Sequence, residues 1–187
     1  MPSVHSFGNL SVQSVDVLSM SQPSTWAKWP RLAKMSVVRV PATAHGRGAA
    51  PIPVLRTVLV ATDFSESANR AIAYAFSLLP TGGTVYLVTV GEGPAVTELE
   101  RDYRQRLHQL VPRDGDAHGR KVQVEVLEGG EDVSQVLLQA AQRWDVDVIC
   151  VGTHGRSGAK SPVMGAVART LLSRADRPVM VVPPLEG

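Results

Sequence analysis

The chain has 187 residues, 44% of them hydrophobic, and a formal net charge of +2. This length allows one ordinary domain with an extension, and the apolar content is sufficient for a buried core. No apolar run approaches the length that crosses a bilayer, so we expect no membrane as a partner. Cys150 is the only cysteine, which excludes an internal disulfide and a cysteine metal cluster.

Charge and composition divide the chain near residue 54. Residues 1–53 are rich in Ser, Pro and Gly, and no sustained period is visible there apart from a candidate short strand at 35–41. Residues 1–55 carry a balance of +4 and residues 56–187 one of −2, which argues against nucleic acid as a partner. No secretory signal pattern is visible, so we expect a cytoplasmic protein. We predict a flexible N-terminal extension over 1–53 and one folded domain over 54–187.

From residue 54 onward, short apolar runs alternate with amphipathic helical patterns. Strands are expected at Val58–Ala61, Val85–Val90, Val122–Leu127, Val146–Val151 and Val179–Val182. Helices are expected at Ala68–Leu79, Ala95–Leu110, Glu131–Arg143 and Val167–Arg174. This alternation predicts an α/β fold, a five-stranded open parallel sheet with helices on both faces. Ligands of such sheets bind beyond the carboxyl ends of the strands, at the switch point of the winding.

A glycine-rich loop, Gly152–Val167, joins an apolar run to a helical pattern. A helix that begins there offers unpaired N–H groups and the positive end of its dipole, which suits a phosphate. We expect Gly152 and Gly155 to adopt positive φ and allow close backbone approach, and Gly165 to let the helix start pass near a ligand. The alternative is an ordinary surface loop with glycine turns.

Asp63 follows the first strand of the domain and belongs to the same carboxyl edge as Gly152. If the two strands are neighbours, its carboxylate faces the glycine loop and is placed to bond a ribose or base. The alternative is an Asp that caps a helix at a βα turn. Spacing does not fix the strand order on which this choice depends. Neither the P-loop motif nor the dinucleotide fingerprint after the first strand is present.

Taken together, three segments resemble the universal stress protein family of the ATP-binding type. They are 58–66 (Val-Leu-Val-Ala-Thr-Asp-Phe-Ser-Glu), 148–158 (Val-Ile-Cys-Val-Gly-Thr-His-Gly-Arg-Ser-Gly) and 177–183 (Arg-Pro-Val-Met-Val-Val-Pro), and the similarity runs from about Leu55 to Pro183. The resemblance implies a Rossmann-like sheet similar to that of the adenine nucleotide alpha hydrolases. It also implies a cytosolic stress-response protein that binds ATP, with or without Mg²⁺, or another adenine nucleotide as a regulatory ligand. Family members commonly dimerise through the last strand, here Val179–Val182.

The resemblance implies nine nucleotide-binding residues: Ala61, Asp63, Val90, Gly152, Gly155, Arg156, Gly165, Ala166 and Val167. Asp63 would bind the adenosine part, beside an adenine pocket lined by Ala61 and Val90. The glycines would shape the ribose and phosphate cradle, and the helix start at Val167 would supply N–H donors. Arg156 either adds charge for the phosphates or is a solvated loop residue.

Ala166 departs from the family pattern, Gly-x₂-Gly-x₉-Gly followed by Ser or Thr. A hydrogen bond to a charged group is worth roughly 1.5–3 kcal/mol, so its loss weakens phosphate binding by about one to two decades. The backbone N–H remains. We therefore expect weak ATP binding or a preference for another adenine nucleotide.

Residues for enzymatic chemistry are not apparent in the sequence. His154 has no paired carboxylate or metal-ligand spacing beside it, so we expect it to pack within the loop, and we expect no catalytic residue and no metal site. Two alternatives remain open: a dimeric interaction module whose nucleotide site has decayed, and a weak ATP hydrolase. The segment Val37–Pro41 looks like the closing strand of a preceding domain copy, and Val37–Val40 is able to compete for the edge of Val179–Val182.

Overall fold

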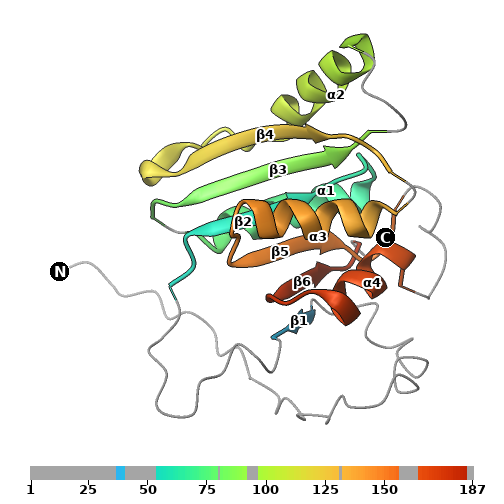
Figure 1. Ribbon diagram of the computed structural model, residues 1–187. Coiled ribbons are helices and arrows are strands. Elements are labelled where there is room, and N and C mark those ends of the chain that lie inside the picture. The colour runs from blue at the N-terminus through green and yellow to red at the C-terminus, as the bar shows by residue number, and fades with distance from the viewer. Residues whose placement is uncertain are drawn as a thin grey trace.

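The computed structural model describes residues 37–40, 54–79, 81–91, 97–130, 132–155 and 164–184. These residues form one sheet flanked by helices (Figure 1). The strands are β1 (Val37–Arg39), β2 (Thr57–Ala61), β3 (Thr84–Val90), β4 (Lys121–Leu127), β5 (Val148–Gly152) and β6 (Val179–Val182). The α-helices are α1 (Glu66–Ser77), α2 (Thr97–Leu110), α3 (Val133–Arg143) and α4 (Ala166–Arg174), and a 3₁₀ turn lies at Ala117–Gly119.

The strand order is β1-β6-β5-β2-β3-β4. Strands β2 to β6 are mutually parallel, which confirms the predicted parallel sheet. The sheet has six strands where five were expected, because β1 pairs antiparallel with β6, Val37 opposite Val181. A strand edge presents unpaired N–H and C=O groups, and the valine-rich segment 37–39 satisfies them. The chain winds outward from β2 in both directions, so the switch point lies between β2 and β5.

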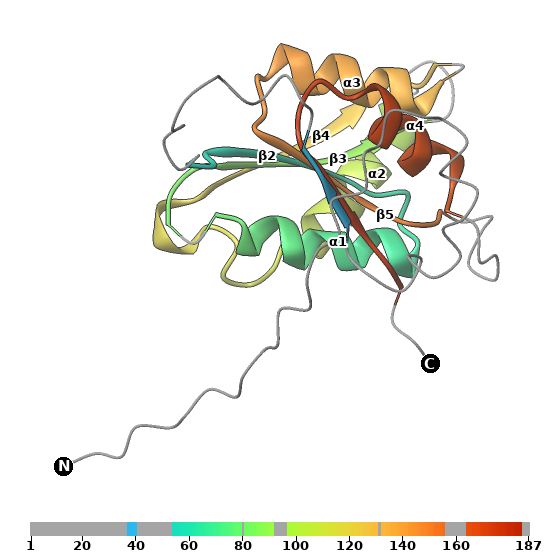
Figure 2. The same ribbon diagram turned by 90° about the horizontal axis from the view of Figure 1, so that it is seen from below.

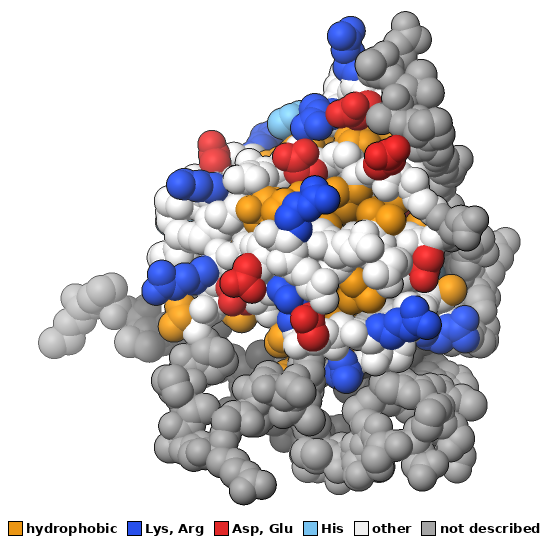
Figure 3. All heavy atoms as spheres, in the orientation of Figure 1, with side chains coloured by type: hydrophobic (Ala, Val, Ile, Leu, Met, Phe, Trp, Pro, Cys, Tyr) orange, Lys and Arg blue, Asp and Glu red, His pale blue; other side chains and the backbone are white. Residues whose placement is uncertain are grey.

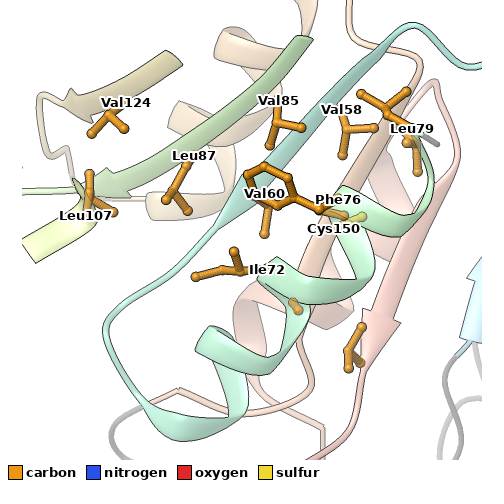
Figure 4. Packing of buried hydrophobic residues seen from close by; sticks show 14 residues of the cluster. Val58, Val60, Ile72, Phe76, Leu79, Val85, Leu87, Leu107, Val124 and Cys150 are labelled. Carbon is orange, nitrogen blue, oxygen red and sulfur yellow. The ribbon is translucent and has the colours of Figure 1, made fainter. Parts of the chain in front are cut away.

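Two helical layers cover the sheet, with α3 and α4 on one face and α1 and α2 on the other (Figure 2). The apolar stripe of α1, which includes Ile72 and Phe76, packs on alternate residues of the strands such as Val60 and Cys150 (Figure 4). The intervening residues, Leu59 among them, pack under α3 and α4. Burial of each such side chain stabilises the fold by roughly 1.5–3 kcal/mol. Packing on both faces therefore fixes β2 and β5, and with them the positions of their carboxyl ends.

Helix α1 begins two residues earlier than the sequence pattern indicates. Ser65 is its N-cap, and the Ser65 hydroxyl accepts a hydrogen bond from the N–H of Ala68 at 3.3 Å. The cap satisfies one of the orphan donors of the first turn. It also fixes where the chain leaves β2, which is the position of Asp63.

Charged side chains organise the amino end of the sheet. The Asp147 carboxylate accepts hydrogen bonds from the N–H groups of Arg56 and Thr57, at 2.7 and 2.8 Å. Arg177, whose side chain is 14% exposed, donates to the carbonyl oxygens of Ala141 and Val146, each at 2.8 Å. These contacts align the strand starts at the end opposite the glycine loop.

Basic and acidic side chains are interspersed over the face shown in Figure 3. None of the helices in the described part of the chain combines the length and apolar character needed to cross a bilayer.

Candidate functional site

The strand order brings the turn after β2 against the loop after β5. The two strands pair directly, with Val60 opposite Cys150. A Cβ atom built on Gly155 would lie 2.6 Å from Oδ2 of Asp63, so the carboxylate rests against the glycine backbone. The sequence left this neighbourhood open, and the structure places the two residues side by side.

Asp63 lies in a turn in which the N–H groups of the neighbouring residues are hydrogen-bonded. The N–H of Thr62 donates to the carbonyl oxygen of Val88 at 2.9 Å and so continues the ladder beyond the end of β2. The N–H of Phe64 donates to Oγ1 of Thr62 at 2.9 Å, and that of Ser65 donates to Oδ1 of Asp63 at 3.0 Å. One carboxylate oxygen thus organises the βα turn while the other faces Gly155. The N-cap of α1 is Ser65, so Asp63 is a residue of the βα turn and not the helix cap of the alternative interpretation, and its role toward a ribose or base stays a prediction.

Phe64 adopts a left-handed backbone conformation, with φ of 67°. For a residue with a Cβ atom this conformation costs roughly 1–2 kcal/mol. Asn69 helps to hold it, since Nδ2 of Asn69 donates to the Phe64 carbonyl at 3.4 Å and Oδ1 of Asn69 accepts from the Thr62 hydroxyl at 2.7 Å. Strain next to a carboxylate at a switch point is typical of functional sites.

Close contacts, and not backbone conformation, explain the glycines of the loop that the structure describes, Gly152, Gly155 and Gly165. The prediction of positive φ at Gly152 and Gly155 is wrong, because neither adopts it. Close approach is confirmed at Gly152, where a Cβ atom would lie 2.8 Å from the backbone of Ser67 and Ala68 in α1. Gly165 lies against the same loop and donates its N–H to the carbonyl oxygen of Thr153 at 2.7 Å.

The N-terminus of α4 approaches this edge with its first amide groups. Gly165 is the N-cap, without a side-chain cap bond, and the first turn contains no acidic residue. The helical bond from Arg169 to Gly165 leaves the N–H groups of Ala166, Val167 and Ala168 ahead of the regular ladder. Ala166 is exposed and Val167 half-buried. The positive end of the dipole is therefore not neutralised by a side chain of its own first turn.

Apolar side chains border the edge on the α3 and α4 face. Ala61 and Val90, the last residues of β2 and β3, are half-buried in one cluster with Val167. Leu127 and Met164 belong to the same cluster and were missed by sequence reasoning. The pairing of β3 with β4 sets Val90 opposite Leu127, a register that the matched apolar strand ends would have indicated.

His154 is 6% exposed and shares a hydrogen bond of 2.9 Å between its Nδ1 and the hydroxyl of Thr153. Its Nε2 is buried without a hydrogen-bond partner in the described part of the chain. This placement agrees with a packing role at the base of the loop. Arg156 lies outside the described residues. Among the residues that the structure describes, no three His, Cys, Asp or Glu side chains come together as a metal site would require.

Comparisons with known proteins agree with this architecture. A universal stress protein of Methanocaldococcus jannaschii is 26% identical over 140 residues, which cover 68% of this chain and 81% of that protein. The universal stress protein from Archaeoglobus fulgidus, solved in complex with dAMP, aligns with a TM-score of 0.54 and 22% identity over 70% of this chain and 99% of that chain. A universal stress protein in complex with cAMP aligns with a TM-score of 0.53 and 17% identity over 71% of this chain and the whole of that chain.

These structural neighbours show the α/β fold, and the sequence match to the family extends over residues 55–183, from the start of β2 to just past β6. That span contains the turn at Asp63, the glycine loop and the first turn of α4. The chain belongs to the universal stress protein family.

Proposed function

We propose that this protein binds an adenine nucleotide as a regulatory ligand in a cytosolic stress response. The observation that carries the proposal is the contact of the Asp63 carboxylate with Gly155, at the edge that the N-terminus of α4 approaches. A carboxylate accepts hydrogen bonds from ribose hydroxyls or an adenine amine, whereas N–H groups at a helix start attract phosphate. This edge of the sheet thus offers a hydrogen-bond acceptor for the adenosine part of a nucleotide and N–H donors for its phosphates.

Charge sets the orientation of the ligand in this proposal. The phosphates lie toward Val167 and the start of α4, away from Asp63, which repels them. The adenosine part lies beside Asp63, with Ala61 and Val90 as its apolar wall. The complexes of related proteins with dAMP and cAMP support an adenine ligand.

ATP is the first ligand to test, and Mg²⁺ would bind through its phosphates, as it commonly does. The described residues supply no cluster of ligands for a metal of their own. The role of Arg156, which lies outside the described residues, and the division of the chain at residues 53 and 54 both stay predictions.

Calorimetric titration with ATP, ADP, AMP and cAMP tests the function, together with mass spectrometry of small molecules released from the purified protein. Asp63→Ala is expected to weaken binding about tenfold to a hundredfold, because a hydrogen bond to a charged group is lost. Asp116→Ala is the matched control, since this exposed carboxylate makes no side-chain cap bond and lies just before β4, at the amino end of the sheet. Absence of any nucleotide in the extract and of binding heat would refute the proposal.

A homodimer through β6 is the second part of the proposal. In the structure β1 already pairs with the edge of β6 that faces away from β5, so the strand of a partner pairs there only after β1 leaves. The interaction of β1 with its own domain therefore competes with assembly.

A further inference from the structure

The turn that presents Asp63 is strained at the next residue, and local hydrogen bonds are not its only support. Phe64 has φ of 67°, and its side chain leaves the turn toward the α1 and α2 face of the sheet, where it packs against the core. A side chain anchored at its tip limits the backbone conformations open to its own residue. What holds the Phe64 ring therefore bears on where the neighbouring carboxylate points.

Helix α2 holds the Phe64 ring with two side chains. The ring of Tyr103 stacks on it with centroids 5.7 Å apart and planes inclined by 25°. The guanidinium carbon of Arg106 lies 3.9 Å from the centre of the Phe64 ring, a cation–π contact. We call Phe64, Tyr103 and Arg106 the aromatic clasp. Offset stacking and a cation on one ring favour a single arrangement of the three groups.

Helix α2 itself is fixed to the sheet independently of this clasp. Leu107 is fully buried, and Nη1 of Arg104 donates to the carbonyl oxygen of Val124 in β4 at 2.8 Å. The clasp thus connects a turn at the carboxyl end of β2 to a helix that is anchored two strands away. The position of α2 relative to the core therefore does not depend on the turn.

We propose that the aromatic clasp holds the strained turn in place and thereby aims the Asp63 carboxylate at the glycine loop, so that Tyr103 and Arg106 are positioning residues for nucleotide binding. The ligand named here rests on the proposed function, whereas the mechanical role of the clasp does not. Neither side chain needs to touch the nucleotide.

Amide hydrogen exchange in the full-length protein without nucleotide tests the mechanical role. The reporters are the N–H group of Phe64, which donates to Oγ1 of Thr62, and the N–H group of Ser65, which donates to Oδ1 of Asp63. We expect Tyr103→Ala to accelerate their exchange about tenfold or more, and Tyr103→Phe, which keeps the ring, to leave it unchanged. Amides of β2 and β5 report on global stability and are expected to stay protected. Unchanged exchange at both reporters in Tyr103→Ala would overturn the inference.

Arg106→Ala is the second variant, because the side chain is 45% exposed and its loss does not endanger folding. Asp102→Asn is its control, since Asp102 lies 3.9 Å from Nη1 of Arg106 and its replacement leaves the clasp intact. Faster exchange of the turn is expected in Arg106→Ala and not in Asp102→Asn. Equal rates in both variants would contradict a role for the cation.

ATP titration of four proteins tests the effect on binding: wild type, Tyr103→Ala, Asp63→Asn and the double variant. Tyr103→Ala is expected to weaken binding about tenfold in the wild-type background and not further in Asp63→Asn, because it acts through that carboxylate. An equal loss in both backgrounds would show that the clasp acts otherwise and overturn the inference. If the wild type binds no adenine nucleotide, the proposed function fails, and the exchange rates alone decide whether the clasp holds the turn.

Discussion

Gly152 and Gly155, at the carboxyl end of β5, differ in the atoms that an added methyl group would contact. A methyl group on Gly152 would meet the backbone of α1, which cannot yield without moving a packed helix. A methyl group on Gly155 would meet the carboxylate of Asp63, the end of a side chain that is able to rotate. The same substitution is therefore expected to damage stability at one position and binding at the other.

We predict that Gly152→Ala lowers the free energy of unfolding by about 1–3 kcal/mol, the usual cost of overpacking. Gly155→Ala is expected to change stability little and to weaken adenine nucleotide binding by about tenfold, because the Asp63 carboxylate is displaced. Urea denaturation and calorimetric titration of both variants measure the two effects, and each variant is the control for the other. Equal stability loss in both would contradict the distinction.

Ala166 offers a gain-of-affinity test at the same scale. Ala166→Ser places a hydroxyl on the first residue of α4, beside the N–H groups at the positive end of its dipole. ATP binding is expected to tighten by about tenfold, since a hydrogen bond to a charged group is added. Adenosine, which lacks phosphate, is the control ligand and is expected to bind both proteins equally. Equal gains for adenosine and ATP would place the phosphates elsewhere.

Cys150 gives a prediction in alkaline solution. Burial raises the pKa of its thiol from the ordinary 9.0 to about 12, because the thiolate is poorly solvated in the core. The thiol of the unfolded chain ionises at a lower pH than the buried thiol of the folded protein. The stability that comes from burying the neutral thiol is therefore complete below pH 9 and is lost as the pH rises toward 12. The loss is on the order of 4 kcal/mol in total.

Denaturation of wild type and Cys150→Ala across this pH range tests the effect. The variant starts less stable, because it leaves space in the core, and lacks the thiol-dependent part of the alkaline loss. Parallel stability curves for the two proteins would show that the thiol does not titrate as expected.

At the scale of elements, hydrogen bonds from a polar side chain connect segments at the amino end of the sheet. Arg177, in the loop between α4 and β6, bonds carbonyl groups of Ala141, in α3, and Val146, just before β5. Its Nε donates to Asp176 and lowers the pKa of that carboxyl. One side chain thus joins the loop between α4 and β6 to α3 and to the segment before β5.

We predict that Arg177→Ala lowers the free energy of unfolding by about 1–3 kcal/mol, because the Val146 carbonyl loses the guanidinium donor and the Ala141 carbonyl keeps only the N–H of Val146. Arg101→Ala, an exposed position on α2, is the control and is expected to change stability by less than about 0.5 kcal/mol. Nucleotide binding is expected to survive in both, since Arg177 lies at the end opposite the candidate site. Thermal or chemical denaturation gives the comparison, and similar values for the two variants would contradict the tie.

At the scale of the whole molecule, β1 determines which surface is open for assembly. Val38 in β1 is 54% exposed, and Val40, the residue that follows the strand, is 48% exposed. Backbone pairing with β6 and the bond from Nη1 of Arg39 to the Ala175 carbonyl, at 3.0 Å, hold it in place. A strand attached in this way is replaceable by another of similar sequence.

We predict that Val38→Pro combined with Arg39→Ala releases β1 and shifts the protein toward a dimer through β6. Proline removes a backbone donor and does not fit a paired strand. Sedimentation velocity over a concentration series compares this variant with the wild type and with Val54→Ala, a change at an exposed valine outside the strands. A variant that stays monomeric at every concentration would argue against assembly at this edge.

Much of the fold follows from local pattern. The five parallel strands and the helices between them were predictable, because apolar periodicity reports which face of each element is buried. The same pattern placed Asp63 and the glycine loop at carboxyl ends of strands, and the family resemblance is confirmed by the match over residues 55–183. Helix starts were predicted only to within two residues, as at α1, which begins at Glu66 and not at Ala68.

Only the tertiary structure decided which of these parts touch. The pairing of β2 with β5, the place of β1 on β6 and the contact of Asp63 with Gly155 join residues far apart in the chain. The reason for Gly152 lies in a helix more than 80 positions away, so the chain around it suggested a turn where the fold required empty space. The contact of the left-handed Phe64 with Tyr103 of α2 likewise joins segments that are distant in the chain. Periodicity is a local property of a chain, whereas a site is made by packing between distant segments.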